Sequence, residues 1–307
     1  MEILFLGTSA AVPSRYRSTS CIAVREGRDI VLLDCGEGAQ RQLMVSPFSF
    51  MKVRAVLITH LHGDHVFGLP GLLQTMGLSG RTDPLLVCGP PGTAGFIGSC
   101  MSYTEGEAGY PLEIRELEGG EEISAGAFSA SCFRTDHGIS SLGYVVRGPA
   151  YPGRLDHAKA LALGVRDGPD MARLKAGEAV GDVTPDMVVG PSSPGTAVAY
   201  TGDTKASSSI AEAVRGADVL IHEATYSASD AASAVEHNHS TSVQAAETAA
   251  AAFVRCLIMT HISHRYDDRS VLEAEAREVF PESYAADDMD MFVVGRGSVR
   301  RESVRPA

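Results

Sequence analysis

The segment His60-Leu61-His62-Gly63-Asp64-His65 gathers three imidazoles and one carboxylate within six residues. It follows the apolar, strand-like run at residues 55–59 directly. Imidazole and carboxylate groups suit zinc or a similar divalent ion. A single segment with enough ligands for parts of two adjacent sites predicts a binuclear metal centre. The alternative is a solvated, histidine-rich loop, which is the weaker interpretation because polar tracts seldom follow a buried strand directly.

Three further segments also place a potential ligand after an apolar, strand-like run. They are residues 198–201 with Asp203, residues 219–221 with His222 and Glu223, and residues 257–260 with His261. Polar residues often follow strands, so one such ending would carry little weight. Because α/β architectures place reactive groups at the carboxyl ends of core strands, we expect the four endings to converge on one site.

The residue types allow a complete ligand set for two ions. A pair of zinc-type ions needs about seven or eight protein contacts, with one carboxylate shared. The predicted set is His60, His62 and His137 for one ion, Asp64, His65 and His261 for the other, and Asp203 as the bridge. Two ions about 3.5–4 Å apart convert a bridging water into a hydroxide nucleophile near neutral pH. The expected reaction is hydrolysis, and phosphodiester and acyl substrates both remain open.

Secondary structure elements must carry these residues, and turn and capping signals predict several of them. The pattern predicts a β-hairpin from residues 21–24 and 30–33, a strand at 85–88, and helices at 69–76, 242–253 and 270–280. Thr241 or Ser240 is the expected cap of the helix at 242–253. The polar tail after Arg296 is expected to be frayed.

Composition bounds the class of protein. The chain has 307 residues, 44% of them hydrophobic, and no apolar run approaches the length of a membrane span. No signal peptide is expected, because the chain enters a strand-like run at residues 2–6. The six cysteines form no Cys-x-x-Cys pair, which predicts buried free thiols and a cytoplasmic location. The net charge of −12 argues against nucleic-acid binding, although a local basic cluster or a metal ion can still attract phosphate.

The segment at residues 148–182 differs from its surroundings in being rich in Gly, Pro and charge. Its apolar residues are too few for a core of their own, so we predict a protruding insertion with a short helix near residues 155–163. The alternative is a disordered surface loop. A local cationic face is expected from Arg154, His157, Lys159, Arg166, Arg173 and Lys175.

The ordered ligand set resembles that of the metallo-β-lactamase superfamily, and further motifs are similar to those of its ribonuclease Z family. These motifs are Asp34-Cys35-Gly36-Glu37-Gly38-Ala39-Gln40-Arg41-Gln42, His222-Glu223-Ala224-Thr225-Tyr226, His239-Ser240-Thr241 and His261-Ile262-Ser263-His264-Arg265-Tyr266. The resemblance covers residues 4–266. It departs from the family pattern at Ala39, at Arg166-Asp167 in the insertion, and at residues 13–18.

The resemblance implies an α/β fold, a four-layer αβ/βα sandwich in which residues 1–307 form a single domain. It implies a zinc-dependent endoribonuclease that removes 3′ trailers from tRNA precursors, leaving a 3′-hydroxyl on the tRNA and a 5′-phosphate on the trailer, with metal-bound hydroxide as the attacking group. Two Zn²⁺ per subunit are expected, and Mn²⁺ or Co²⁺ would suit the same ligands. Asp64 would accept a proton and orient the hydroxide, while His239, paired with Glu223, would protonate the leaving oxygen. Asp34 would steady the histidine ligands.

The same resemblance implies that the insertion at residues 148–182 is an exosite arm for precursor tRNA. The expected substrate-binding residues are Arg154, Lys159, Arg173, Lys175 and Arg265. A homodimer, a cytoplasmic location and no membrane partner are expected with it. A small-molecule hydrolase of the same fold, acting on a phosphodiester, sulfate ester or lactone, is the alternative, but it gives no reason for a cationic arm. An RNA-binding relative with an inactive site is disfavoured because the full ligand set is present.

Overall fold

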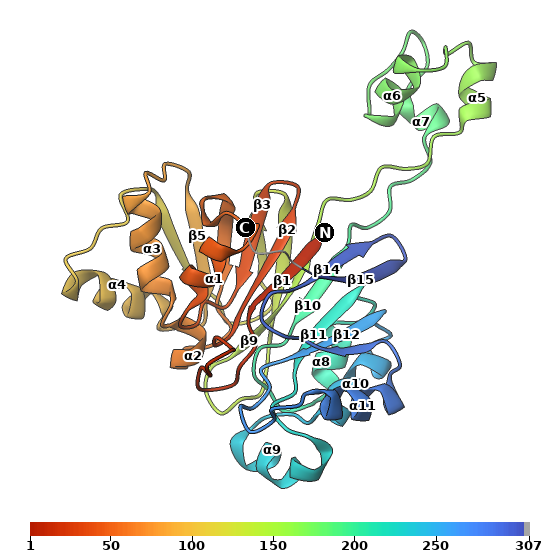
Figure 1. Cartoon of the computed structure of the whole chain (residues 1–307). Helices are drawn as coiled ribbons and strands as arrows, with labels where there is room; N and C mark the ends of the chain where they lie inside the picture. Colours follow the sequence, from red (N-terminus) through yellow and green to blue (C-terminus); the bar gives the residue numbers. More distant parts are fainter. Residues whose placement is uncertain (304–307) are drawn as a thin grey trace. The chain divides into compact units, whose positions relative to one another are not determined.

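Two mixed β-sheets contain the strands that end at the predicted ligands (Figure 1). The structure, a computed structural model, describes residues 1–303. The first sheet is formed by β1 (Glu2–Gly7), β2 (Cys21–Glu26), β3 (Asp29–Leu33), β4 (Val53–Leu57), β5 (Leu85–Gly89), β6 (Leu112–Glu116), β14 (Asp290–Gly295) and β15 (Ser298–Ser303). Its strand order is β15-β14-β1-β2-β3-β4-β5-β6. Strands β3 to β6 are parallel, so their carboxyl ends share one edge.

The second sheet contains the remaining strands of the described chain. They are β7 (Glu122–Ala125), β8 (Phe128–Arg134), β9 (Leu142–Arg147), β10 (Ala197–Tyr200), β11 (Val219–Glu223), β12 (Cys256–Thr260) and β13 (Ser283–Ala285). The order is β13-β12-β11-β10-β9-β8-β7, with β10 to β13 parallel. Both sheets therefore present the carboxyl ends of parallel, buried strands, as the strand endings predicted.

Three hydrophobic clusters separate four layers. One cluster, with Phe5, Tyr144 and Ile258, fills the space between the two sheets. A second lies between the first sheet and α1 (Ala39–Val45), α3 (Leu69–Leu78) and α4 (Thr93–Tyr103). A third lies between the second sheet and α8 (Ser208–Ala213), α10 (Ser242–Ala251) and α11 (Ser270–Val279). Figure 1 shows the two groups of helices on the outer faces of the sheets. The predicted αβ/βα sandwich is confirmed.

The remaining helices of this part of the chain are short. α2 (Gly63–Val66) and α9 (Ala231–His237) border the strand endings, and two 3₁₀ helices span Phe50–Lys52 and Ala228–Asp230. The predicted cap of α10 is Thr241, whose side chain accepts the N–H of Gln244 in a capping box. No helix within residues 1–303 combines the length and the apolar character that a bilayer crossing requires.

Two elements differ from expectation. The tail after Arg296 is not frayed over its first part, because residues up to 303 form β15, which pairs with β14 through a turn at Gly297 (φ +80°). Residues 304–307, also assigned to the frayed tail, lie outside the described residues. Helix α4 was not predicted, because Gly95 and Gly98 weaken its helical signal.

Residues 148–196 form a second compact unit, separate from the unit of residues 1–147 and 197–303. It contains α5 (His157–Ala162), α6 (Pro169–Lys175) and α7 (Pro185–Val188). The expectation that it lacks a core is wrong. The predicted insertion ends at residue 182, whereas the buried cluster also includes Val183 and Val188. The cluster consists of Ala160, Val165, Met171, Leu174, Val183 and Val188.

Candidate metal centre

The segment after β4 turns sharply to present its ligands. His60 and His62 lie in extended chain, and α2 then begins at Gly63 and carries Asp64 and His65. His60 and His65 are buried, while His62 is exposed. The Nε2 atom of His60 lies 3.0 Å from Nδ1 of His62. The short helix therefore divides the segment into two ligand pairs.

The second sheet supplies three more side chains. His137 follows β8, Asp203 follows β10, and His261 follows β12 with a left-handed backbone (φ +53°). His137 Nε2 lies 3.2 Å from His62 Nδ1, and His261 Nε2 lies 3.2 Å from Asp64 Oδ2. The structure thus brings all seven predicted ligands together in two groups. They are His60, His62 and His137 in one, and Asp64, His65, Asp203 and His261 in the other.

Asp203 lies between the two groups. Its Oδ2 atom is 3.3 Å from Nε2 of both His65 and His261, and 3.7 Å from Nε2 of both His60 and His137. Ligand atoms of a tetrahedral zinc site, at about 2.0–2.1 Å from the ion, are about 3.3–3.4 Å apart. The distances from Asp203 to His65 and His261 match this value and the others lie between 3.0 and 3.7 Å, so the side chains are spaced closely enough to bind divalent metal.

The opposite ring nitrogens of four histidines are engaged, as metal-binding histidines require. Nδ1 of His60 contacts Thr59 Oγ1 at 3.0 Å, and Nδ1 of His137 contacts the Asn238 carbonyl at 3.0 Å. His65 and His261 make the corresponding contacts with Asp34 Oδ2 (2.7 Å) and Thr225 Oγ1 (2.9 Å). Each contact leaves Nε2 to face the other ligands. His65 Nε2 and Asp203 Oδ1 are buried without a hydrogen-bond partner, which is consistent with a cation between them.

Asp34 contacts one of the predicted histidine ligands, His65, and lies at the junction of the two sheets. Its carboxylate is fully buried and accepts hydrogen bonds from the Thr59 N–H (2.7 Å), the Tyr200 hydroxyl (2.8 Å) and His65 Nδ1. Because Tyr200 belongs to the second sheet, Asp34 joins the two sheets directly beneath the ligands. Its own backbone is left-handed (φ +60°), a conformation that asparagine and aspartate tolerate better than most residues.

The electrostatics of the centre favour a cation. Burial disfavours ionisation of Asp64, but His261 and His65 hold its pKa well below the usual value. Burial and the nearby charge of His65 lower the pKa of His60, which leaves its imidazole neutral, as a metal ligand must be. Burial also opposes a charge on His65, yet Asp203 and Asp34 raise its pKa well above the usual value. The carboxylates thus stabilise positive charge at this point.

Glu223 and His239 form a pair beside the ligands. Glu223, at the end of β11, is buried, and its Oε1 lies 2.8 Å from His239 Nδ1. The Thr225 hydroxyl donates to its other oxygen at 2.8 Å. Burial works against a charge on His239, but the carboxylate of Glu223 raises its pKa to about 9. The contact with Glu223 thus favours the protonated form of His239.

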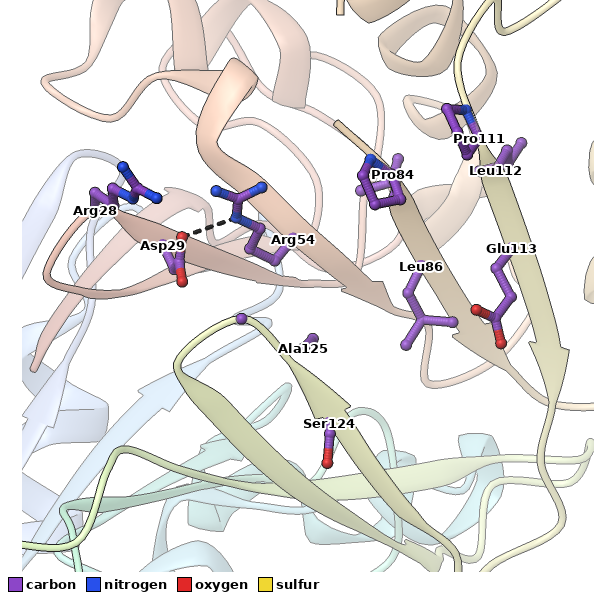
Figure 2. Close-up of a pocket in the computed structure, with 12 residues that line it drawn as sticks. Arg28, Asp29, Arg54, Pro84, Leu86, Pro111, Leu112, Glu113, Ser124 and Ala125 are labelled. Atoms are coloured by element: carbon purple, nitrogen blue, oxygen red, sulfur yellow. Dashed lines mark hydrogen bonds and ion pairs between the residues drawn. The ribbon is translucent and has the colours of Figure 1, made fainter. Parts of the chain in front are cut away.

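A cavity of about 620 Å³ opens over the centre. Its lining includes the site residues His62, Asp64, His137, Asp203, His239 and His261, together with the apolar residues Ala11, Val12, Pro13 and Phe67. A second cavity of about 640 Å³, shown in Figure 2, lies between the starts of β5 and β6 and the β7–β8 turn. It contains the Arg54–Asp29 ion pair, with Nε 2.8 Å from Oδ1, and none of the predicted site residues.

The predicted substrate-binding residues are divided between the two units. Arg154, Lys159, Arg173 and Lys175 belong to the second unit and are exposed. Arg265 belongs to the first unit, where its guanidinium lies 4.9 Å from the centre of the Tyr226 ring. It does not line the cavity over the metal centre.

Several contacts at the centre were not anticipated. The N–H of Ala11 donates to Asp64 Oδ2 at 2.9 Å, and Ala11 adopts a left-handed backbone (φ +58°) to do so. Thr59, Thr225 and Asn238 orient histidines. These three are next to or within the motifs, so adjacency was an available signal. Ala11 acts through its backbone, for which the sequence offers none.

Comparisons with known proteins identify the family to which this chain belongs. Residues 173–262 match the family model "Beta-lactamase superfamily domain", and residues 1–91 match "Anti-Pycsar protein Apyc1". Ribonuclease Z of Enterococcus faecalis is 40% identical over 305 residues, which cover 96% of this chain and 97% of the relative. Ribonuclease Z of Methanothermobacter thermautotrophicus is 40% identical over 293 residues, covering 94% of this chain and 95% of the relative. The chain belongs to the ribonuclease Z family.

Solved structures agree with membership of the ribonuclease Z family. The crystal structure of the short form of human tRNase Z matches with a TM-score of 0.71 and 28% identity, covering 96% of this chain and 100% of that one. The metallo-β-lactamase fold protein YhfI of Bacillus subtilis matches with a TM-score of 0.69 and 19% identity, covering 95% and 99%, a likeness that concerns the fold alone. The His/Asp cluster on this fold indicates binding of divalent metal.

Proposed function

We propose that this chain is a metal-dependent endoribonuclease that removes 3′ trailers from precursor tRNA, leaving a 3′-hydroxyl on the tRNA and a 5′-phosphate on the trailer. The observation that carries the proposal is that two ligand groups and the Glu223–His239 pair lie together and that members of each line one cavity. Similarity to proteins named ribonuclease Z over nearly the whole chain supports the choice of substrate.

The metal ligands are assigned by their grouping. His60, His62 and His137 would hold one Zn²⁺, Asp64, His65 and His261 the other, and Asp203 would bridge them. Mn²⁺ or Co²⁺ would fit the same donors. When bound, the two ions would activate the attacking water and neutralise charge on the phosphate. The protein's part would be to hold the imidazoles in place, through the contacts of Thr59, Thr225, Asn238 and Asp34.

Asp64 and His239 would handle the protons. Asp64 faces the cavity and, kept ionised by its neighbours, would accept the proton of the attacking water while the Ala11 N–H fixes its orientation. His239 also lines the cavity and is favoured in its protonated form, so it would donate to the departing ribose oxygen. Glu223 would hold His239 in its charged form.

The second unit is the proposed tRNA-binding arm. Its residues 148–196 include five Lys or Arg and six Asp or Glu, so the formal charge is −1. Two of these cations are paired, Arg166 with Asp170 and Arg173 with Glu178. The exposed cations without a partner among the described residues are Arg154, Lys159 and Lys175, which we propose as the phosphate contacts of the arm. A homodimer and a cytoplasmic location, which suits six free cysteines, belong to the same proposal.

The deciding experiment is to incubate the protein with a 3′-extended tRNA and to map the cut, with and without a chelator. Cleavage at the trailer junction that is lost with the chelator and restored by Zn²⁺ is expected. His60→Ala and Asp203→Ala should each abolish cleavage and lower the metal content per chain. A wild-type protein that hydrolyses a small aryl phosphodiester but leaves the tRNA uncut would instead favour the small-molecule hydrolase.

The arm can be removed with little disturbance to the sheet. Arg147 and Ala197 are paired in the antiparallel β9–β10 ladder, so an Asn-Gly turn can join them in place of residues 148–196. We expect this variant to lose cleavage of precursor tRNA and to keep hydrolysis of the aryl phosphodiester. Triple replacement of Arg154, Lys159 and Lys175 by Gln should act in the same direction. Equal loss of both activities would count against the arm.

A further inference from the structure

The side chain of Phe67 is exposed at the edge of the metal centre. It follows α2 directly, two residues after His65, and 67% of its surface is accessible. It lines the cavity over the centre and also an adjoining cavity of about 280 Å³. Of the described residues that line the first cavity, it is the one aromatic residue besides the histidines. An exposed aromatic ring therefore faces the space over the metal centre, where a substrate would bind.

The ring is held in position by the metal-binding segment itself. A Cβ atom at Gly63 would lie 2.2 Å from Cε2 of Phe67 and 2.7 Å from its Cζ. The ring therefore lies directly against the backbone at the start of α2, next to Asp64 and His65.

The surroundings of Phe67 combine apolar and charged groups, as a nucleotide does. Ala11, Val12 and Pro13 also line the first cavity, Arg41 lines the adjoining one, and Glu37 lines both. A phosphodiester bound at the centre continues as a nucleotide on each side, and each nucleotide has a flat, apolar base next to a charged phosphate. Stacking on an aromatic ring tolerates any base, because every base has a π-face.

We propose that Phe67 is a stacking platform for the base of a nucleotide that flanks the scissile phosphate. This inference rests on the proposed function, since it requires an RNA substrate at the centre. Arg41, exposed and without a partner among the described residues, would lie near the phosphate of the adjoining nucleotide. Phe67 would thus position the substrate.

The test compares Phe67→Leu, which keeps apolar volume without the π-face, with Phe67→Trp, which keeps both. Phe253→Leu is the matched control, because Phe253 is similarly exposed (73%) and does not line the cavity. With 3′-extended tRNA, Phe67→Leu should raise KM by about 5- to 150-fold, the range expected for one base–aromatic stack, and leave kcat unchanged. Phe67→Trp should restore most of the loss, and Phe253→Leu should match the wild type.

Substrates with an abasic nucleotide on one or the other side of the cut complete the test. One of them should raise the KM of the wild type by a similar factor and have little further effect on Phe67→Leu, because the same contact is already missing. A normal KM in Phe67→Leu, with a wild type that cuts the tRNA, would overturn the stacking role. If this variant lost bound metal, Phe67 would instead support the structure of α2, and the stacking role would be overturned as well. A wild type that leaves the tRNA uncut would overturn the proposed function and this inference together.

Discussion

Replacing Asp34 with Asn would keep the shape of a buried side chain and reverse part of its hydrogen bonding. Oδ2 accepts from His65 Nδ1 at 2.7 Å and from the Tyr200 hydroxyl at 2.8 Å, while Oδ1 accepts the Thr59 N–H at 2.7 Å. An amide has one acceptor and one donor end, so whichever way it points, one set of donors would face an NH₂ group. The better compromise moves the proton of His65 from Nδ1 to Nε2, which removes Nε2 as a ligand.

The expected magnitude follows from that lost ligand. Changes to a residue that supports a metal-bound histidine cost about 10- to 100-fold in metal affinity or activity, or about 1.4–2.7 kcal/mol. The protein should therefore lose metal to a weak chelator at a correspondingly lower chelator concentration. The measurements are metal per chain by mass spectrometry after dialysis and kcat/KM on a 3′-extended tRNA.

The matched control is Asp218→Asn, at the opposite end of the second sheet. Asp218 also accepts a backbone N–H, from Ala197 at 2.8 Å, but it contacts no predicted ligand. It should keep the metal content and activity of the wild type. Normal metal content and activity in Asp34→Asn would refute the argument that Asp34 sets the tautomer of His65.

Three other experiments probe separate features. Glu223→Gln removes the charge that raises the pKa of His239 to about 9. Because the protonated form is the proposed donor, the wild-type rate should fall as pH rises through that pKa. In the variant, this fall on the alkaline side of the pH–rate profile should occur at lower pH. A fall at an unchanged pH would contradict the pairing. Alkylation of the folded protein at pH 8 should modify Cys100 alone, since the other five cysteines are buried. Burial also raises the pKa of three of these five thiols to about 11 or 12. Detection of a second rapidly modified cysteine by mass spectrometry would contradict this prediction. Gly95→Ala, in α4 with open space around its Cβ position, should stabilise the fold by about 0.5–1 kcal/mol. Gly36→Ala, whose Cβ would lie 2.2 Å from the Asp64 carbonyl oxygen, should destabilise it by about 1–3 kcal/mol, and thermal unfolding that ranked the two the other way would refute the packing argument.

The candidate site was the most predictable part of the molecule. Apolar strands are recognisable over a few residues, and a ligand that follows each one is fixed in space by the edge of the sheet. His60, Asp203 and His261 could therefore be grouped without any knowledge of the loops between them. Contacts made through backbone atoms, such as the N–H of Ala11, carry no residue signature and could not be predicted.

Elements with weak local signals were also missed. The glycines of α4 lower its helix propensity, and its packing against the first sheet overrides that preference. Strand β15 is polar because it lies at the edge of its sheet, so its sequence resembles that of a loose tail. The core of the second unit depends on Val183 and Val188, which follow a proline- and glycine-rich stretch that obscured the continuity of the unit.

Each ligand group takes side chains from both sheets. His60 and His62, which follow the first sheet, lie beside His137 of the second sheet. Asp64 and His65 in the same way lie beside His261 of the second sheet. Ions bound as proposed would act as a reversible cross-link between the two halves of the sandwich. Metal bound at 1,000 times its dissociation constant would add about 4 kcal/mol to the free energy of unfolding, an amount comparable with the whole stability of many domains. The supply of metal in the cell would then set how long the folded chain survives as well as how fast it works.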